Sequence, residues 1–165
     1  MVDPNVNLWI DSCSVEDCTI NGAIAVGGIL GGGTVYSMTQ ITNSHNRNTK
    51  VTASYNCAGG IVGYADTLYV YSCSNNGTIK GAASTTAPPG NLPANSIYNV
   101  GAGGIAGGSG LSTIISSRNS GTVQGSRGVG GIIGSTLVTT PPKTYYNNTF
   151  IGFCSNSGNI TATVI

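Results

Sequence analysis

Few side chains in this sequence could support acid–base or metal chemistry. The 165 residues include one histidine, His45, and five carboxylates. Polysaccharide cleavage needs paired carboxylates, or acids that hold a metal ion beside a base. Asp11, Glu16 and Asp17 lie close together in sequence and could bind a cation, but solvated charges that protect an exposed sheet edge explain them more simply. The sequence therefore predicts no catalytic residue, no metal, no cofactor and no enzyme.

Nucleophilic and nucleotide-binding motifs are missing from the sequence as well. Ser44 precedes His45, but a Ser–His pair also needs an orienting acid, and the nearest one in sequence is Asp66. The sequence predicts a polar residue at a bend for His45. The glycine-rich segments lack the Lys-Ser/Thr of a P-loop, and no helical pattern follows them.

The composition predicts a folded chain with an apolar core. Hydrophobic residues make up 39% of the sequence and charged residues 7%, against roughly 25% in typical globular proteins. The six basic residues are spread along the chain, so we expect no nucleic-acid binding. The sequence lacks a continuous apolar run of the length that spans a bilayer, so we expect no membrane insertion. The first residues lack the features of a signal peptide, which leaves the compartment open.

Two sequence patterns alternate along the chain, and they supply the elements that must position any functional side chain. The second pattern runs Ile/Val, Cys/Ser at +3, Asn at +5, Gly at +7 and Ile/Val at +9, and it begins at Ile10, Ile41, Val70, Ile114 and Ile151. The copies that begin at Ile10 and Ile41 are one residue longer. The first pattern, Val/Ala-Gly-Gly-Ile-x-Gly, contributes the structural residues Gly28, Ile29, Gly60, Ile61, Gly104, Ile105, Gly131 and Ile132.

A repeat of about 27 residues with this composition predicts one turn of a parallel β-helix. Each glycine costs about 1 kcal/mol in a helix interior, whereas β-branched residues suit short strands. Asn-x-Gly suits bends that need positive φ, and Gly-Gly suits close backbone packing. We expect an all-β, single-domain solenoid over residues 1–165, with about five coils of three short strands each. The aliphatic residues of successive coils should stack in columns, because one coil cannot bury its own apolar face.

At these residues the sequence resembles the GLUG-motif repeat family. The resemblance rests on Gly60-Ile61-Val62-Gly63 and on the Cys-Ser-Asn-Asn-Gly-Thr-Ile segment at residues 73–79. It implies a β-solenoid from a large secreted or surface-anchored microbial protein, used as a stalk, spacer or adhesive surface. The family brings no catalytic residues, so none are carried over. The resemblance also implies an extracellular or cell-surface location.

The five cysteines fall into two groups. Cys13, Cys73 and Cys154 share one position of the repeat, with Ser44 and Ser117 at that position in the coils between them. Alternate coils lie roughly 9.6 Å apart, which is too far for a disulfide, so we expect small buried residues that fill a corner. Cys18 and Cys57 could pair with each other or with Cys13, and the sequence leaves their disulfide state open.

Two insertions interrupt the repeat, near residues 82–100 and 136–148. Insertions leave a solenoid at its corners and often carry binding function. Tyr145 and Tyr146, in the second insertion, could stack on a sugar ring or a partner surface, or pack back onto the solenoid. Tyr69 and Tyr71 should face outward, either as an adhesive patch or as ordinary cross-strand aromatic packing.

Together these patterns predict a non-catalytic structural and adhesive repeat module. The sequence starts in a strand near Leu8 and stops without a capping segment, which favours a fragment of a longer repeat protein or a subunit that stacks end to end into a filament. The expected partners are neighbouring repeats or further copies of the chain, together with a glycan or host surface. A self-assembling filament subunit and a carbohydrate-binding solenoid that uses its corner loops are the alternative functions.

Overall fold

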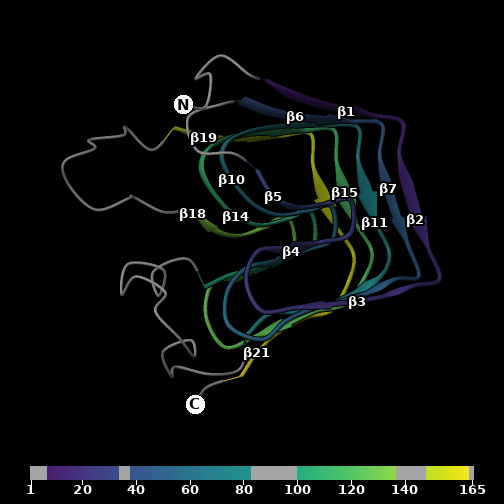
Figure 1. Ribbon diagram of the computed structural model, residues 1–165, viewed down its shortest axis with the longest axis vertical. Coiled ribbons are helices and arrows are strands. Elements are labelled where there is room, and N and C mark those ends of the chain that lie inside the picture. The colour runs from purple at the N-terminus through teal and green to yellow at the C-terminus, as the bar shows by residue number, and fades with distance from the viewer. Residues whose placement is uncertain (1–6, 34–37, 83–99, 137–147, 164–165) are drawn as a thin grey trace.

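Parallel β-sheets make up the regular structure of the chain (Figure 1). The computed structural model describes residues 7–33, 38–82, 100–136 and 148–163. Within these ranges all regular elements are strands, and every strand pair is parallel. The structure therefore confirms an all-β chain, with its strands arranged in four sheets.

The four sheets, named here sheets A to D, collect equivalent strands from successive repeats. Sheet A contains β1 (Leu8–Asp11), β5 (Leu30–Gly32), β6 (Met38–Thr42), β10 (Val62–Tyr71), β14 (Ala106–Ile115), β18 (Ile133–Thr136) and β19 (Thr149–Gly152). Sheet B contains β2 (Ser14–Glu16), β7 (His45–Arg47), β11 (Ser74–Asn75), β15 (Arg118–Asn119) and β20 (Ser155–Asn156). Sheet C contains β3 (Thr19–Gly22), β8 (Lys50–Ala53), β12 (Thr78–Lys80), β16 (Val123–Gly125) and β21 (Ile160–Ala162). Sheet D contains β4 (Val26–Gly27), β9 (Ala58–Gly59), β13 (Ala102–Gly103) and β17 (Val129–Gly130).

The first predicted aliphatic column is present in sheet A. It pairs in register as Ile10, Ile41, Val70, Ile114 and Ile151. Ile41, Val70 and Ile114 are fully buried. Ile151, in the last described repeat, is 44% exposed, because no described strand covers its other side. The column therefore forms one side of the apolar core.

The second predicted column is held by backbone hydrogen bonds between successive Gly-Gly-Ile segments. The Ile29 N–H donates to the Ile61 carbonyl, Ile61 to Ile105, and Ile105 to Ile132, each at 2.9 Å. Ile61 and Ile105 are fully buried beside the first column, and Ile29 and Ile132 pack against that cluster. A separate cluster between sheets C and D contains Val51, Ile79 and Val123. The apolar interior therefore runs through the stacked repeats, as the spacing predicts.

The prediction of three strands per repeat is wrong. Each complete repeat crosses five strand segments in four sheets, and two of these segments are merged in the long strands β10 and β14. The first half of β10 pairs with β5, through Val62 and Leu30, and its second half pairs with β6. The extra strand arises at Gly-Gly, where the chain turns tightly: a Cβ on Gly59 would lie 1.9 Å from the carbonyl oxygen of Val62.

The predicted role of the Asn-x-Gly glycine is also wrong. In every copy positive φ occurs just before the Cys/Ser position, at Ser12, Asn43, Ser72, Ser116 and Phe153. At the +7 position, which holds glycine in the three shorter copies, positive φ occurs only in the two longer copies, at Asp17 and Asn48. Gly77 does not adopt positive φ; instead, a Cβ there would lie 2.1 Å from the Thr49 carbonyl oxygen in the neighbouring repeat. This glycine therefore permits close packing between repeats rather than a left-handed turn.

Candidate functional site

Sheet B carries polar side chains on both of its faces. Successive residues of a strand point to opposite faces. Within sheet B, each of the strands β7, β11, β15 and β20 places one asparagine on the inner face. Asn46, Asn75 and Asn119 are buried, while the residues on either side of them are partly or fully exposed. The sheet therefore has an inner row of asparagines and an outer polar surface.

The inner row is an asparagine ladder that links three repeats. Asn75 Nδ2 donates to Asn119 Oδ1 at 2.6 Å, and Asn119 Nδ2 donates to Asn156 Oδ1 at 2.7 Å. Each of these amides also bonds to the backbone of the glycine two residues later; Gly121 N–H, for example, donates to Asn119 Oδ1 at 3.2 Å. Asn46 lies at the same register position, but its side-chain amide has no hydrogen-bond partner in the described structure.

The second glycine of each Gly-Gly pair lies against this ladder. A Cβ on Gly104 would lie 2.3 Å from Asn119 Cγ, and one on Gly60 would lie 2.5 Å from Asn75 Cγ. Gly131 meets Asn156 in the same way, and Gly28 meets Asn46 at 3.0 Å or more. The two sequence patterns therefore meet inside the protein, with the glycine of one making room for the asparagine of the other.

The outer face of sheet B forms a shallow polar groove across four repeats, named here the sheet B groove. One rank across it runs His45, Ser74, Arg118 and Ser155 in register. The residues two positions further along each strand form the second rank. Its members that line the groove are Arg47, Asn76, Ser120 and Ser157.

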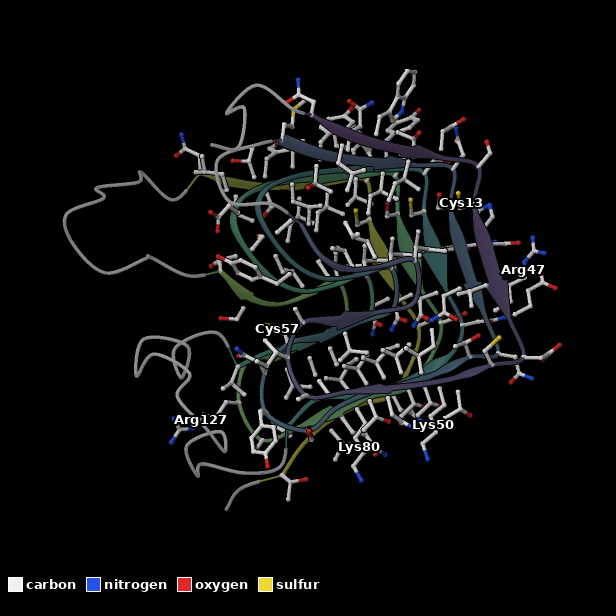
Figure 2. The ribbon with its side chains drawn as sticks, in the orientation of Figure 1. Cys13, Arg47, Lys50, Cys57, Lys80 and Arg127 are labelled. Atoms are coloured by element: carbon white, nitrogen blue, oxygen red, sulfur yellow. The ribbon has the colours of Figure 1, made fainter. Side chains whose placement is uncertain are left out.

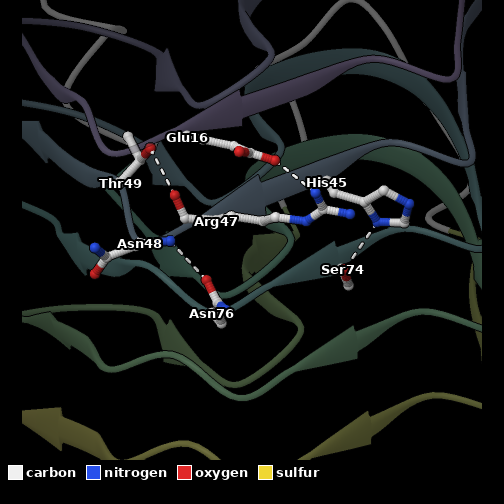
Figure 3. A network of polar contacts seen from close by, with 7 residues as sticks. All are labelled: Glu16, His45, Arg47, Asn48, Thr49, Ser74 and Asn76. Carbon is white, nitrogen blue, oxygen red and sulfur yellow. Dashed lines mark hydrogen bonds and ion pairs between the residues drawn. The ribbon is translucent and has the colours of Figure 1, made fainter.

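Hydrogen bonds between repeats organise one end of the groove (Figure 3). The Arg47 guanidinium pairs with Glu16 at 2.5 Å between Nη1 and Oε1. His45 Nδ1 lies 2.8 Å from Ser74 Oγ. The Arg118 side chain is exposed and has no ion pair within residues 7–33, 38–82, 100–136 and 148–163. One groove cation is therefore paired and one is not.

The three acids near the N-terminus do not meet at one site. Asp11 accepts hydrogen bonds from Thr42, from Asn43 at 2.9 Å and from Ser12 at 3.0 Å. These bonds, with Thr42 first, lower the pKa of the Asp11 carboxyl. Glu16 pairs with Arg47, and Asp17 accepts from Asn48 Nδ2 at 2.7 Å. Each acid thus contacts a different part of the next repeat, and the described residues contain no group of three or more potential metal ligands.

The structure separates the two neighbouring residues Ser44 and His45. Ser44 is buried, and its hydroxyl donates to the Thr42 carbonyl at 2.8 Å. His45 is the first residue of β7, so it lies in a strand and not at the predicted bend, and its ring faces the sheet B groove. The two side chains therefore point to opposite faces of the sheet.

The predicted Cys/Ser column is present. Cys13 N–H donates to Ser44 Oγ, and Cys73 N–H to Ser117 Oγ, both at 3.2 Å. Cys73 is buried as predicted, but Cys13 is exposed, because no described repeat covers that side of it. None of the five cysteines forms a disulfide in the described structure, so the suggested pairing of Cys18 with Cys57 or Cys13 is absent. Burial raises the pKa of the Cys57 thiol to about 12 and that of Cys73 to about 11.

The predicted aromatic binding residues have different outcomes. Tyr145 and Tyr146 lie outside the described residues. Tyr69 and Tyr71 lie in β10 and point away from the core, since Leu68 and Val70 between and beside them are buried and Tyr71 is 43% exposed. Trp9 and Phe150, both more than half exposed, share the register rank of Tyr69.

Apart from His45, the groove residues are not among the sequence-based candidates, although a signal for them exists. They occupy positions +4 and +6 of the second pattern, on either side of the ladder asparagine. Because side chains alternate along a strand, an inward asparagine at +5 requires its two neighbours to face outward.

These features define an all-β protein of stacked parallel sheets, with a buried asparagine ladder beneath a polar outer groove. Comparisons with protein-family models, with curated proteins and with solved structures found no match. Among the described residues, no helix has the length and apolar character needed to cross a bilayer.

Proposed function

We propose that the chain winds as a parallel β-solenoid of about five coils and serves as a non-catalytic structural and adhesive repeat module of an extracellular or cell-surface protein. The observation that carries this proposal is the in-register stacking of equivalent residues from every repeat, such as Ile10, Ile41 and Val70. Such stacking makes stability a property of neighbouring repeats, which suits an extended spacer. The resemblance to GLUG-motif repeats supports the same role.

Surface location and adhesion can be tested separately. Brief protease treatment of intact producing cells should release peptides of this chain; peptides recovered only after lysis would contradict a surface location. Beads coated with the purified chain should adhere to mucin-coated surfaces more strongly than beads coated with an unrelated β-sheet protein. Equal adhesion of the two bead types would contradict the adhesive role and leave the spacer role in place.

Self-association is a second candidate, favoured by the last described strands. In the described structure β19, β20 and β21 each pair with a strand on one side only, so their other edges are unpaired. All three residues of β21 are exposed. A further repeat of a longer chain or another copy of this chain could pair with these edges. Electron microscopy at high protein concentration tests the second possibility: filaments support it, and monodisperse particles alone contradict it.

A further inference from the structure

We propose that the sheet B groove binds an acidic polysaccharide, a chain of sugars bearing carboxylate groups, with Arg118 as its anion-binding residue. This inference goes beyond the spacer role and does not depend on where the protein is located. It differs from binding by the corner loops, because it uses only residues of the stacked sheet.

The charges on the groove favour an anionic ligand. Its charged side chains are Arg47 and Arg118, with Glu16 beside Arg47 at one end. Glu16 neutralises Arg47, although the Arg47 side chain remains 57% exposed. Arg118 lies further along the groove with no carboxylate partner in the described parts of the chain. An arginine can hold a carboxylate through two parallel hydrogen bonds, which makes Arg118 complementary to a uronate group.

The neutral groove residues suit a ligand rich in hydroxyl groups. Ser74 and Ser155 flank Arg118 in register on the two adjacent strands, at steps of about 4.8 Å. Ser120 follows Arg118 in the same outward alternation, and Asn76 adds an amide. Ser120 Oγ already donates to the Asn75 carbonyl at 3.4 Å, and Ser74 Oγ is bonded to His45, but each hydroxyl oxygen can still accept a hydrogen bond from a sugar hydroxyl. The groove therefore offers a row of hydrogen-bonding groups around one anion-binding side chain.

The same groove does not suit a nucleic acid. Single-stranded binding sites combine a track of several cations with aromatic side chains on which bases stack. The residues that line this groove include no Trp, Tyr or Phe, and the single ring among them, that of His45, lies 2.8 Å from Ser74 Oγ through Nδ1. Only one of the two arginines lacks an acidic partner. A chain that bears one carboxylate on each hydroxyl-rich sugar, as a polyuronate does, is the better match.

The test is a titration of the full chain with oligogalacturonate, in which binding is measured by calorimetry and by changes in amide chemical shifts. We expect binding, with the largest shifts in β11, β15 and β20, and no binding of neutral dextran. Arg118→Gln should weaken binding about tenfold, as expected for the loss of a charge-assisted bidentate contact. Arg127→Gln is the matched control: it removes the same charge from an exposed position on the opposite side of the molecule from Arg47 (Figure 2), and should leave the affinity unchanged.

Several outcomes would overturn the proposal. These are no binding of oligogalacturonate, equal weakening by Arg118→Gln and Arg127→Gln, or equal binding of single-stranded DNA. Binding of dextran sulfate in addition to oligogalacturonate would support the shared chemistry of an anionic sugar chain. Because Arg118 is exposed, its replacement leaves the core intact, and unchanged amide spectra outside the groove will verify this. A negative result in the bead-adhesion test is distinct from a negative result in this titration, because the titration uses a purified ligand in solution.

Discussion

The side-chain amide of Asn119 lies directly against Gly104, so closely that a Cβ on the glycine would come within 2.3 Å of Asn119 Cγ. The same Cβ would lie 2.2 Å from the carbonyl oxygen of Gly131 in the next repeat. Gly104 belongs to one sequence pattern and Asn119 to the other. Their contact explains why the two patterns alternate: each needs the other to complete the interior of the repeat.

Gly104→Ala should strongly destabilise the protein. The methyl group would meet backbone and a hydrogen-bonded amide, neither of which can move freely, so we expect a loss of about 3 kcal/mol in the free energy of unfolding. Gly32→Ala is the control, because its Cβ would meet no atom closer than 3.7 Å. Urea denaturation of both variants measures the difference, and an equally small effect of the two would refute the packing argument.

Asn119→Ala should cost much more stability than Asn46→Ala. Removing Asn119 leaves the Nδ2 of Asn75 and the Oδ1 of Asn156 without their ladder partner, which we expect to cost about 3 kcal/mol. Asn46 is buried at an equivalent position but its amide forms no hydrogen bond in the described structure. Its replacement should cost less than about 1 kcal/mol. Thermal unfolding distinguishes the two, and a larger loss for Asn46→Ala would show that the ladder is not stabilising.

Truncation within one aliphatic column should follow burial. Ile114 is fully buried between Val70 and Ile151, so Ile114→Ala should cost about 3 kcal/mol. Ile151 is 44% exposed, and Ile151→Ala should cost about 1 kcal/mol. Equilibrium denaturation is the measurement. Equal losses at the two positions would mean that the column does not run through a shared interior.

Stability should fall at alkaline pH because of the buried thiols. The pKa of Cys73 rises from its ordinary value of 9.0 to about 11, since burial disfavours the thiolate. The folded protein therefore keeps this proton between those values while the unfolded chain loses it, so the free energy of unfolding decreases as pH rises from about 9 to about 11. Cys73 should contribute up to about 1.4 kcal/mol per pH unit in this window.

Cys73→Ser isolates that contribution, because serine already occupies the same column position at Ser44 and Ser117. Denaturation curves at several pH values should show a shallower alkaline decline for the variant than for the parent protein. Identical slopes in the two proteins would show that the Cys73 thiol does not stay protonated in the folded state.

The aliphatic columns could be predicted from the sequence because isoleucine and valine recur at fixed distances. Burial then requires these side chains to point toward the interior. Ile61 and Ile105 illustrate this success. The number of strands could not be predicted, because the tight turn at Gly59 depends on a contact with Val62 that spacing does not reveal. The positive φ just before the Cys/Ser position could not be predicted, because three of the five residues there are serine and one is phenylalanine, and these types carry no such signal.

The sheet B groove was missed for a different reason. Its outward positions mix serine with arginine, histidine and asparagine, so no single residue type fills either rank from repeat to repeat. Only the alternation around the buried asparagines identifies those positions as one surface. The binding role predicted for Tyr145 and Tyr146 stays a prediction, because both lie outside the described residues.

The central claim is that equivalent residues of successive repeats pair in parallel, one repeat directly on the next. Scalar couplings measured across hydrogen bonds by nuclear magnetic resonance test this most directly. The account predicts couplings from the Ile61 N–H to the Ile105 carbonyl and from the Ile105 N–H to the Ile132 carbonyl. Couplings that instead join these amides to antiparallel partners within their own repeat would contradict it.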